Sequence, residues 1–183
     1  TPAYAVEQSR QVASVMADKS RKAMDLAMEL LQGYDEAKAE QVAQMETDVD
    51  RFEDELGTYL VKLSSRQLSG KDSETLNTIL HCIGDFERIS DHARNVKEAA
   101  QEMYDKKLDF SDKAHEELKV FERAVHDILD ITMNSFIKGD LNLARQVEPM
   151  EEVIDGLSLD VKQRHVRRLR KGKCTIELGF ILS

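Results

Sequence analysis

The chain has 183 residues, of which 33% are charged, and a formal net charge of −9. This acidic balance argues against nucleic acid as the main partner, because a phosphate backbone requires a basic face. Only two prolines and eight glycines interrupt the chain, and 41% of its residues are hydrophobic, which is enough for a packed core. No run approaches the roughly 20 apolar residues that span a bilayer, so we expect no membrane span in this chain.

Apolar residues recur at helical spacing along the first half of the chain. A first helix carries apolar positions from Ala13 to Leu30. A second is predicted from Asp35, whose side chain can cap it, to about Leu68. Its apolar stripe is expected at Val42, Met45, Val49, Phe52, Leu56, Tyr59 and Leu63. A third helix is predicted from the residues after Asp72 to about Tyr104.

The second half repeats this organisation after a break at residues 109–112. A fourth helix is predicted through Leu118 and Phe136. A fifth carries Val147 to Val161 and ends at residues 171–173, and Pro149 is expected to kink it. A sixth begins near residue 175 and stops at 183. The pattern therefore predicts an all-α fold.

An internal repeat supports two related units. A shift of 105 residues superposes seven residues of the second helix on identical residue types in the fifth. The superposed positions are Asp35, Ala39, Gln41, Val42, Met45, Glu46 and Asp50 on Asp140, Ala144, Gln146, Val147, Met150, Glu151 and Asp155. Coincidence between two amphipathic helices is the alternative. We predict two three-helix units over residues 1–106 and 107–183, with six long antiparallel helices, the last truncated.

Three acidic pairs have a spacing of four residues and therefore share a helix face. They are Glu46 with Asp50, Glu87 with Asp91, and Glu151 with Asp155. Two such carboxylates can hold one hard cation, and oxygen ligands suit magnesium, manganese, iron or calcium. The alternative is ordinary solvated helix surface, since many acidic pairs at this spacing are expected in so acidic a chain.

Other motifs say little about catalysis. No nucleophile elbow, phosphate-binding loop or dinucleotide fingerprint is present, so we expect no enzyme. A carboxylate-bridged metalloenzyme and a purely structural adaptor remain as alternatives.

A basic run near the end of the fifth helix suits the helix dipole, or contacts anionic lipid or a transporter. Its members are Arg164, Arg167, Arg168, Arg170, Lys171 and Lys173.

Two motifs carry a family resemblance. Residues 85–93 read DFERISDHA and resemble the DLERIGDHA signature of PhoU proteins, and residues 46–53, ETDVDRFE, resemble that family's first acidic motif. The resemblance implies two three-helix bundles in tandem. It also implies that such acidic motifs bind iron or another divalent metal, such as manganese, magnesium or zinc. The implied metal ligands are Glu46, Asp50, Glu87, Asp91, Glu151 and Asp155.

Residues 1–10, TPAYAVEQSR, resemble the segment that follows the membrane part of bacterial Na+/phosphate cotransporters. This narrower resemblance implies a regulatory domain on the cytoplasmic side of the cell membrane that modulates phosphate uptake. Its partners would be the transmembrane part of the transporter and a second copy in a homodimer. The alternative is a free-standing PhoU regulator of a phosphate ABC transporter and its sensor kinase. The second unit lacks its own copy of the 85–93 motif, so we expect the sequence to be truncated.

Overall fold

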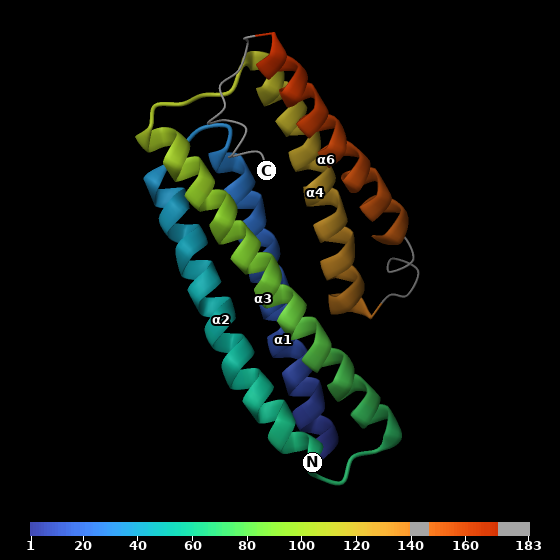
Figure 1. Cartoon of the computed structure of the whole chain (residues 1–183). Helices are drawn as coiled ribbons and strands as arrows, with labels where there is room; N and C mark the ends of the chain where they lie inside the picture. The colour runs from blue at the N-terminus through green and yellow to red at the C-terminus, as the bar shows by residue number, and fades with distance from the viewer. Residues whose placement is uncertain (140–146, 172–183) are drawn as a thin grey trace. The chain divides into compact units, whose positions relative to one another are not determined.

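The structure, a computed structural model, describes residues 1–139 and 147–171, with 147–155, 161 and 169 described by backbone alone. These residues form five α-helices and no strand (Figure 1). The helices are α1 (Pro2–Leu30), α2 (Glu36–Ser64), α3 (Gly70–Asp105), α4 (Asp112–Lys138) and α6 (Val147–Arg170). The predicted all-α class is confirmed. The predicted sixth helix, from residue 175, lies outside the described residues.

The start of α2 confirms the predicted cap. Asp35 has an extended backbone, and its side chain accepts a hydrogen bond of 3.0 Å from the Lys38 amide. This bond satisfies one of the amides that a helix start leaves without a partner. The helix ends at Ser64, before the predicted Leu68.

Local side chains also determine where the following helices begin and end. Ser69 Oγ accepts from the Asp72 amide at 3.1 Å and donates to the Asp72 carboxylate at 2.7 Å, so α3 begins earlier than predicted. Ser111 caps α4, and Gly139 ends it in the left-handed conformation with a φ of 63°. Pro149 lies in the first turn of α6, where an amide has no intrahelical partner. The predicted kink at this proline stays a prediction, because residues 140–146 before it lie outside the described residues.

The end of α3 is closed by a Schellman turn. Leu108 N donates to Met103 O at 2.9 Å, and Lys107 N donates to Tyr104 O at 3.1 Å. Lys107 takes the left-handed position with a φ of 54°, a conformation that usually favours glycine. The turn directs the chain towards α4.

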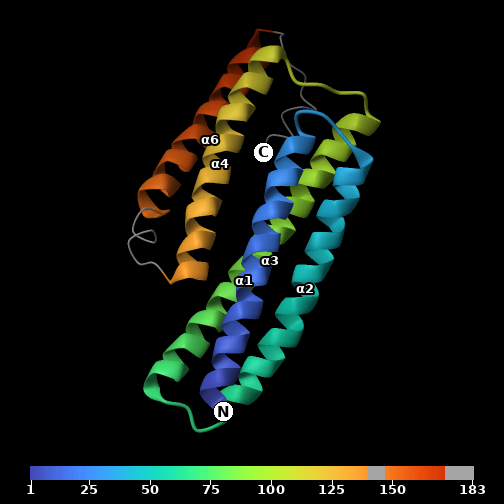
Figure 2. The ribbon, with the colours of Figure 1, turned by 180° about the vertical axis from the view of Figure 1, so that it is seen from behind.

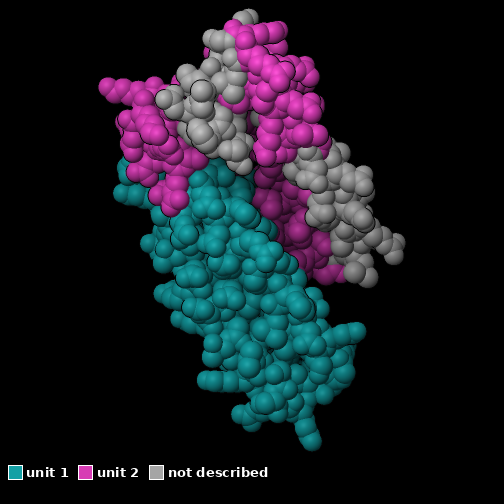
Figure 3. Space-filling model, viewed as in Figure 1, with its two compact units in different colours: residues 1–27, 35–96 teal, residues 28–34, 97–183 magenta. Residues whose placement is uncertain are grey.

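The chain divides into two compact units (Figure 3). Unit 1 comprises residues 1–27 and 35–96, and unit 2 comprises 28–34 and 97–183. The division of the sequence into repeats at residues 106 and 107 stays a prediction. In the part of the chain that the structure describes, no helix carries an apolar stretch long enough to cross a membrane.

Unit 1 is a bundle of three helices, which lie side by side in both views (Figure 1 and Figure 2). Polar contacts join them in pairs. The buried Ser20 Oγ on α1 donates to Phe86 O on α3 at 2.9 Å. Lys19 on α1 forms a 3.2 Å ion pair with Asp48 on α2. These contacts link α1 to α3 and to α2.

The buried stripe of α2 differs from the predicted one. Its buried members are Ala39, Val42, Glu46, Val49, Leu56, Leu60 and Leu63. The predicted Tyr59 is 48% exposed, whereas its neighbour Leu60 is fully buried. Along part of the helix the inward face is thus displaced by one residue from the predicted stripe. The displacement brings Glu46, rather than Met45, to the core.

Unit 2 packs α4 beside α6 (Figure 2). A small apolar cluster of Met103, Phe110, Ala114 and Leu118 anchors the start of α4. His115 lies beside this cluster and joins two loops, with Nδ1 2.9 Å from Gln32 Oε1 and Nε2 2.7 Å from Asp109 Oδ1. The start of α4 is therefore held by both apolar and polar contacts.

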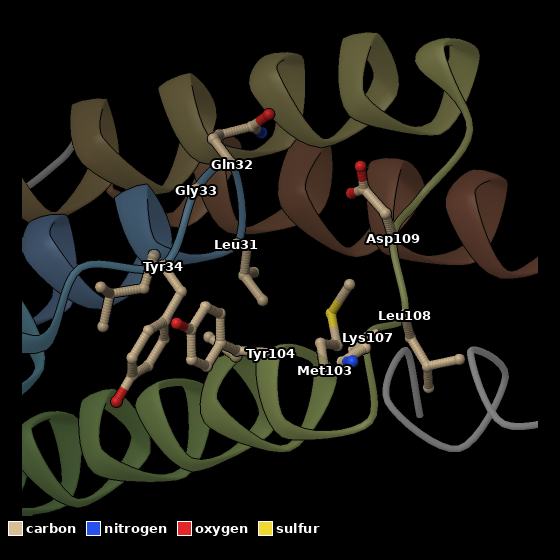
Figure 4. Close-up of a pocket in the computed structure, with 11 residues that line it drawn as sticks. Leu31, Gln32, Gly33, Tyr34, Met103, Tyr104, Lys107, Leu108 and Asp109 are labelled. Carbon is tan, nitrogen blue, oxygen red and sulfur yellow. The ribbon is translucent and has the colours of Figure 1, made fainter.

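A cavity of about 390 Å³ lies in the same unit, beside the loop at residues 31–34 (Figure 4). The rings of Tyr34 and Tyr104 stack on its wall with centroids 4.7 Å apart. Leu31, Met103 and Leu108 supply its apolar lining. None of the predicted site residues lines this cavity.

Candidate acidic site in the first compact unit

The candidate site lies where α2 and α3 face each other in unit 1. On α2, Glu46 is one turn from Asp50, and on α3, Glu87 is one turn from Asp91. Glu46 is 8% exposed and lies between Val42 and Val49 on the inward stripe, whereas Asp50 is exposed. Helical spacing therefore gives each helix an acidic pair, and the rotation of α2 buries one member.

Arg94 is the counter-ion of the buried carboxylate. Its Nη1 donates to Glu46 Oε1 at 2.9 Å, and its Nη2 lies 4.0 Å from Asp91 Oδ1. The Glu46 side chain is only 11% exposed, whereas that of Arg94 is 44% exposed. A buried carboxylate without such a partner would be costly. Arg94 therefore allows an acidic side chain to occupy a core position.

The pKa of Glu46 is raised above its ordinary value, chiefly by burial. Arg94 opposes this shift, while Asp91 and Asp50 add to it. The pKa of Glu87 is raised to about 7, first by burial and then by a hydrogen bond and charge repulsion from Asp91. Near neutral pH, Glu87 and Asp91 can therefore share a proton.

Electrostatic interactions thus link the four carboxylates predicted in the first unit. The structure also adds two residues that sequence reasoning missed. Glu53 has a raised pKa, caused first by burial and then by Asp54 and Asp50, and its charge contributes to the raised pKa of Glu87. Arg94 is the other. Both lie seven residues beyond the first acid on their helix, Glu46 and Glu87 respectively, a spacing that returns to the same helix face.

The corresponding pair in the second unit has a different status. Glu151 and Asp155 lie one turn apart on α6, as predicted. Their side chains lie outside the described residues, so their role stays a prediction.

The donor set suits a hard divalent cation, because it consists of carboxylate oxygens with excess negative charge. The side-chain arrangement is less suitable. Within residues 1–139 and the described part of α6, no three acidic, histidine or cysteine side chains converge as a metal site would require. Arg94 already holds one oxygen of Glu46. The geometry in this structure suits a shared proton and an arginine, and a cation would need the side chains to move.

This geometry defines a class of domain, namely a three-helix bundle with facing acidic pairs on adjoining helices. Residues 13–100 match the PhoU domain. The matched segment spans most of unit 1 and includes the acidic residues of α2 and α3 described above, but not Glu151 and Asp155.

A curated relative extends the similarity. The chain is 24% identical over 156 residues to the phosphate-specific transport system accessory protein PhoU homolog 1 of Thermotoga maritima. The aligned region covers 85% of this chain and 66% of that relative. The chain therefore spans slightly less than two thirds of the length of the relative.

Proposed function

We propose that this chain is a regulatory, non-catalytic domain of a phosphate-transport system. The observation that carries the proposal is the PhoU match over residues 13–100, which covers most of the bundle that contains the acidic site. The accessory role stated in the name of the Thermotoga maritima relative supports the same class of function.

The more specific form of this proposal is a domain on the cytoplasmic side of a Na+/phosphate cotransporter that modulates phosphate uptake. The similarity of residues 1–10 to the segment that follows the membrane part of such transporters supports it. The second candidate is a free-standing accessory protein of a phosphate ABC transporter, which the name of the relative favours. The gene upstream of Thr1 separates the two, because membrane-spanning helices there are expected only for the cotransporter.

We propose that the acidic site is the regulatory element of unit 1. A divalent cation such as iron, manganese, magnesium or zinc, when bound, would neutralise these carboxylates and join α2 to α3. Glu46, Asp50, Glu87 and Asp91 would hold it, after Glu46 exchanged Arg94 for the cation. A proton shared by Glu87 and Asp91 offers a weaker form of the same neutralisation.

Phosphate uptake by cells that carry the full-length gene tests the proposed regulation. We expect the double variant Glu87→Gln/Asp91→Asn to change uptake or its response to external phosphate. Glu55→Gln, an exposed substitution on α2, is the matched control and is expected to behave as wild type. Unchanged uptake in the double variant, with the protein present at normal levels, would refute a regulatory role for this site.

Metal content of the purified protein tests the cation separately. After incubation with iron or manganese, we expect Glu46→Ala/Asp50→Ala to lower the metal-to-protein ratio and to remove any metal-dependent rise in melting temperature. Equal metal content and thermal stability in wild type and variant would rule out the metal while leaving the proton-based form of the site intact.

A further inference from the structure

A cavity of about 540 Å³ opens in unit 2 between the first turns of α4 and the last turns of α6. Its lining includes five cationic side chains: Lys113, Arg164, Arg167, Arg168 and Lys171. Two carboxylates, Glu117 and Asp160, also line it. Five cations against two carboxylates leave a formal charge of +3 in a chain whose net charge is −9. The cavity is therefore a concentrated region of positive charge.

Glu117 compensates only part of this charge. Its side chain is 11% exposed and accepts from Arg164 Nη1 at 3.3 Å and from Arg168 Nη1 at 3.0 Å. Asp160 lies 4.0 Å from Arg164. None of the described residues forms an ion pair with the other three cations, Lys113, Arg167 and Lys171. The cavity thus retains cationic groups beyond those that its own carboxylates neutralise.

Arg168 carries a further sign of an incomplete site. Its side chain is only 12% exposed, and its Nε is buried with no hydrogen-bond partner among the described residues. Buried donors are almost always satisfied in folded proteins. Burial lowers the pKa of the neighbouring His165, and the charge of Arg168 lowers it further, as expected beside a concentration of positive charge. An anion in the cavity would balance the positive charge that Glu117 leaves uncompensated.

The helix geometry favours the same kind of ligand. Ser111 caps α4 and lines the cavity, so the positive end of a 27-residue helix lies at its edge. Guanidinium groups do not lose their protons at accessible pH, so an anion rather than deprotonation must balance them. Their planar donors match phosphoryl oxygens in pairs. The volume lies within the range of small-molecule sites.

We propose that this cavity binds the phosphoryl group of a small phosphorylated anion. The inference goes beyond the proposed function, since it depends only on the charges of unit 2. The phosphoryl group can belong to a soluble ligand, such as inorganic phosphate or pyrophosphate, or to the headgroup of an anionic lipid.

Isothermal titration of the full chain with phosphate and with pyrophosphate, at constant ionic strength set by chloride, tests the proposal. A parallel arm measures sedimentation with phosphatidylcholine vesicles that contain phosphatidic acid. We expect saturable binding in at least one arm. We expect Arg167→Ala/Lys171→Ala to weaken it roughly tenfold, because each charged donor contributes substantially. Neither residue forms an ion pair with the described part of the chain, so the fold should survive.

Lys62→Ala/Arg66→Ala is the matched control, because it removes two exposed cations at the end of α2. We expect it to bind as wild type. Binding of pyrophosphate or phosphate identifies a soluble ligand, and binding of vesicles alone identifies a lipid headgroup. The absence of saturable binding in every arm, or an equal loss in both double variants, would overturn the proposal. Neither result depends on phosphate uptake, so failure here is separate from failure of the proposed function.

Discussion

The two compact units each contain a cluster of like charges, but of opposite sign. In unit 1, Arg94 lies among the carboxylates of α2 and α3. In unit 2, Glu117 lies among the arginines of α6. Each cluster therefore uses a buried or half-exposed ion pair across two helices to reduce its own repulsion.

The clusters differ in how the remaining repulsion can be relieved. A carboxylate can take up a proton, and the pKa of about 7 at Glu87 shows that this relief is available near neutral pH. An arginine cannot release its proton under the same conditions. The acidic cluster can therefore respond to pH as well as to a cation, whereas the basic cluster depends on an anion.

The largest effect is expected at Glu117 in the basic cluster. Glu117→Gln removes the carboxylate shared by Arg164 and Arg168 and should lower the free energy of unfolding by about 2 kcal/mol. Urea unfolding at low ionic strength measures the change. The control is the exposed neighbour Glu116→Gln, which should have little effect. Equal stabilities of the two variants would show that the arginines do not need this carboxylate.

The corresponding test in the acidic cluster is Arg94→Met, which removes the charge and keeps an apolar stem. It should lower the free energy of unfolding by about 1.5 kcal/mol where Glu46 is ionised. The loss should shrink at acidic pH, because protonated Glu46 no longer needs a counter-ion. Urea unfolding at neutral pH and at acidic pH measures the loss under the two conditions. The control is Arg88→Met, a substitution at an exposed position of α3. A loss that did not depend on pH would assign Arg94 a packing role alone.

Glu87 provides a test of the proton itself. Because its pKa is raised from 4.5 to about 7, its protonated form adds stability that is complete below pH 4.5 and is lost as the pH rises through about 7. Glu87→Gln should therefore flatten this pH dependence and stabilise the protein at alkaline pH by about 1 kcal/mol, after allowance for solvent screening. Thermal unfolding across this pH range measures both effects. If the stability of Glu87→Gln depended on pH as steeply as that of wild type, Glu87 would not be the group that takes up the proton. The control Glu55→Gln should keep the pH dependence of wild type.

The smallest effect is expected outside both clusters. Lys107 has a left-handed backbone at the end of α3, which strains a residue with a β-carbon. Lys107→Gly should raise the free energy of unfolding by about 0.5 kcal/mol, the gain being partly offset by chain entropy. Lys107→Ala keeps the β-carbon and should give no such gain in urea unfolding. If the stability gain of Lys107→Gly changed with pH or with pyrophosphate, the end of α3 would be coupled to one of the two charged clusters.

Several features of the fold could be predicted from sequence because they are local. The Asp35 cap and the break before α4 depend on neighbouring residues and backbone conformation. The spacing of the acidic pairs on α2 and α3 is equally local, since a helix places residues four apart on one face. Extended over seven residues, the same rule would have found Glu53 and Arg94.

The inward face of α2 could not be predicted in the same way. Met45 and Glu46 are adjacent, and the apolar pattern at 42, 45 and 49 is as regular as the observed one at 42, 46 and 49. The choice depends on the rotation of α2, which the packing of three helices sets. Arg94 on α3 makes the acidic alternative acceptable by pairing with Glu46.

Local sequence patterns suffice for the all-α class, several helix ends and the acidic pairs, because hydrogen bonds and helical periodicity act over a few residues. The packing of the helices determines which charges meet. Glu46 pairs with Arg94 on the next helix, and Glu117 pairs with Arg164 and Arg168 on α6. Such pairing depends on how each helix is rotated against its neighbour. Apolar packing across the bundle sets that rotation, and no local pattern records it.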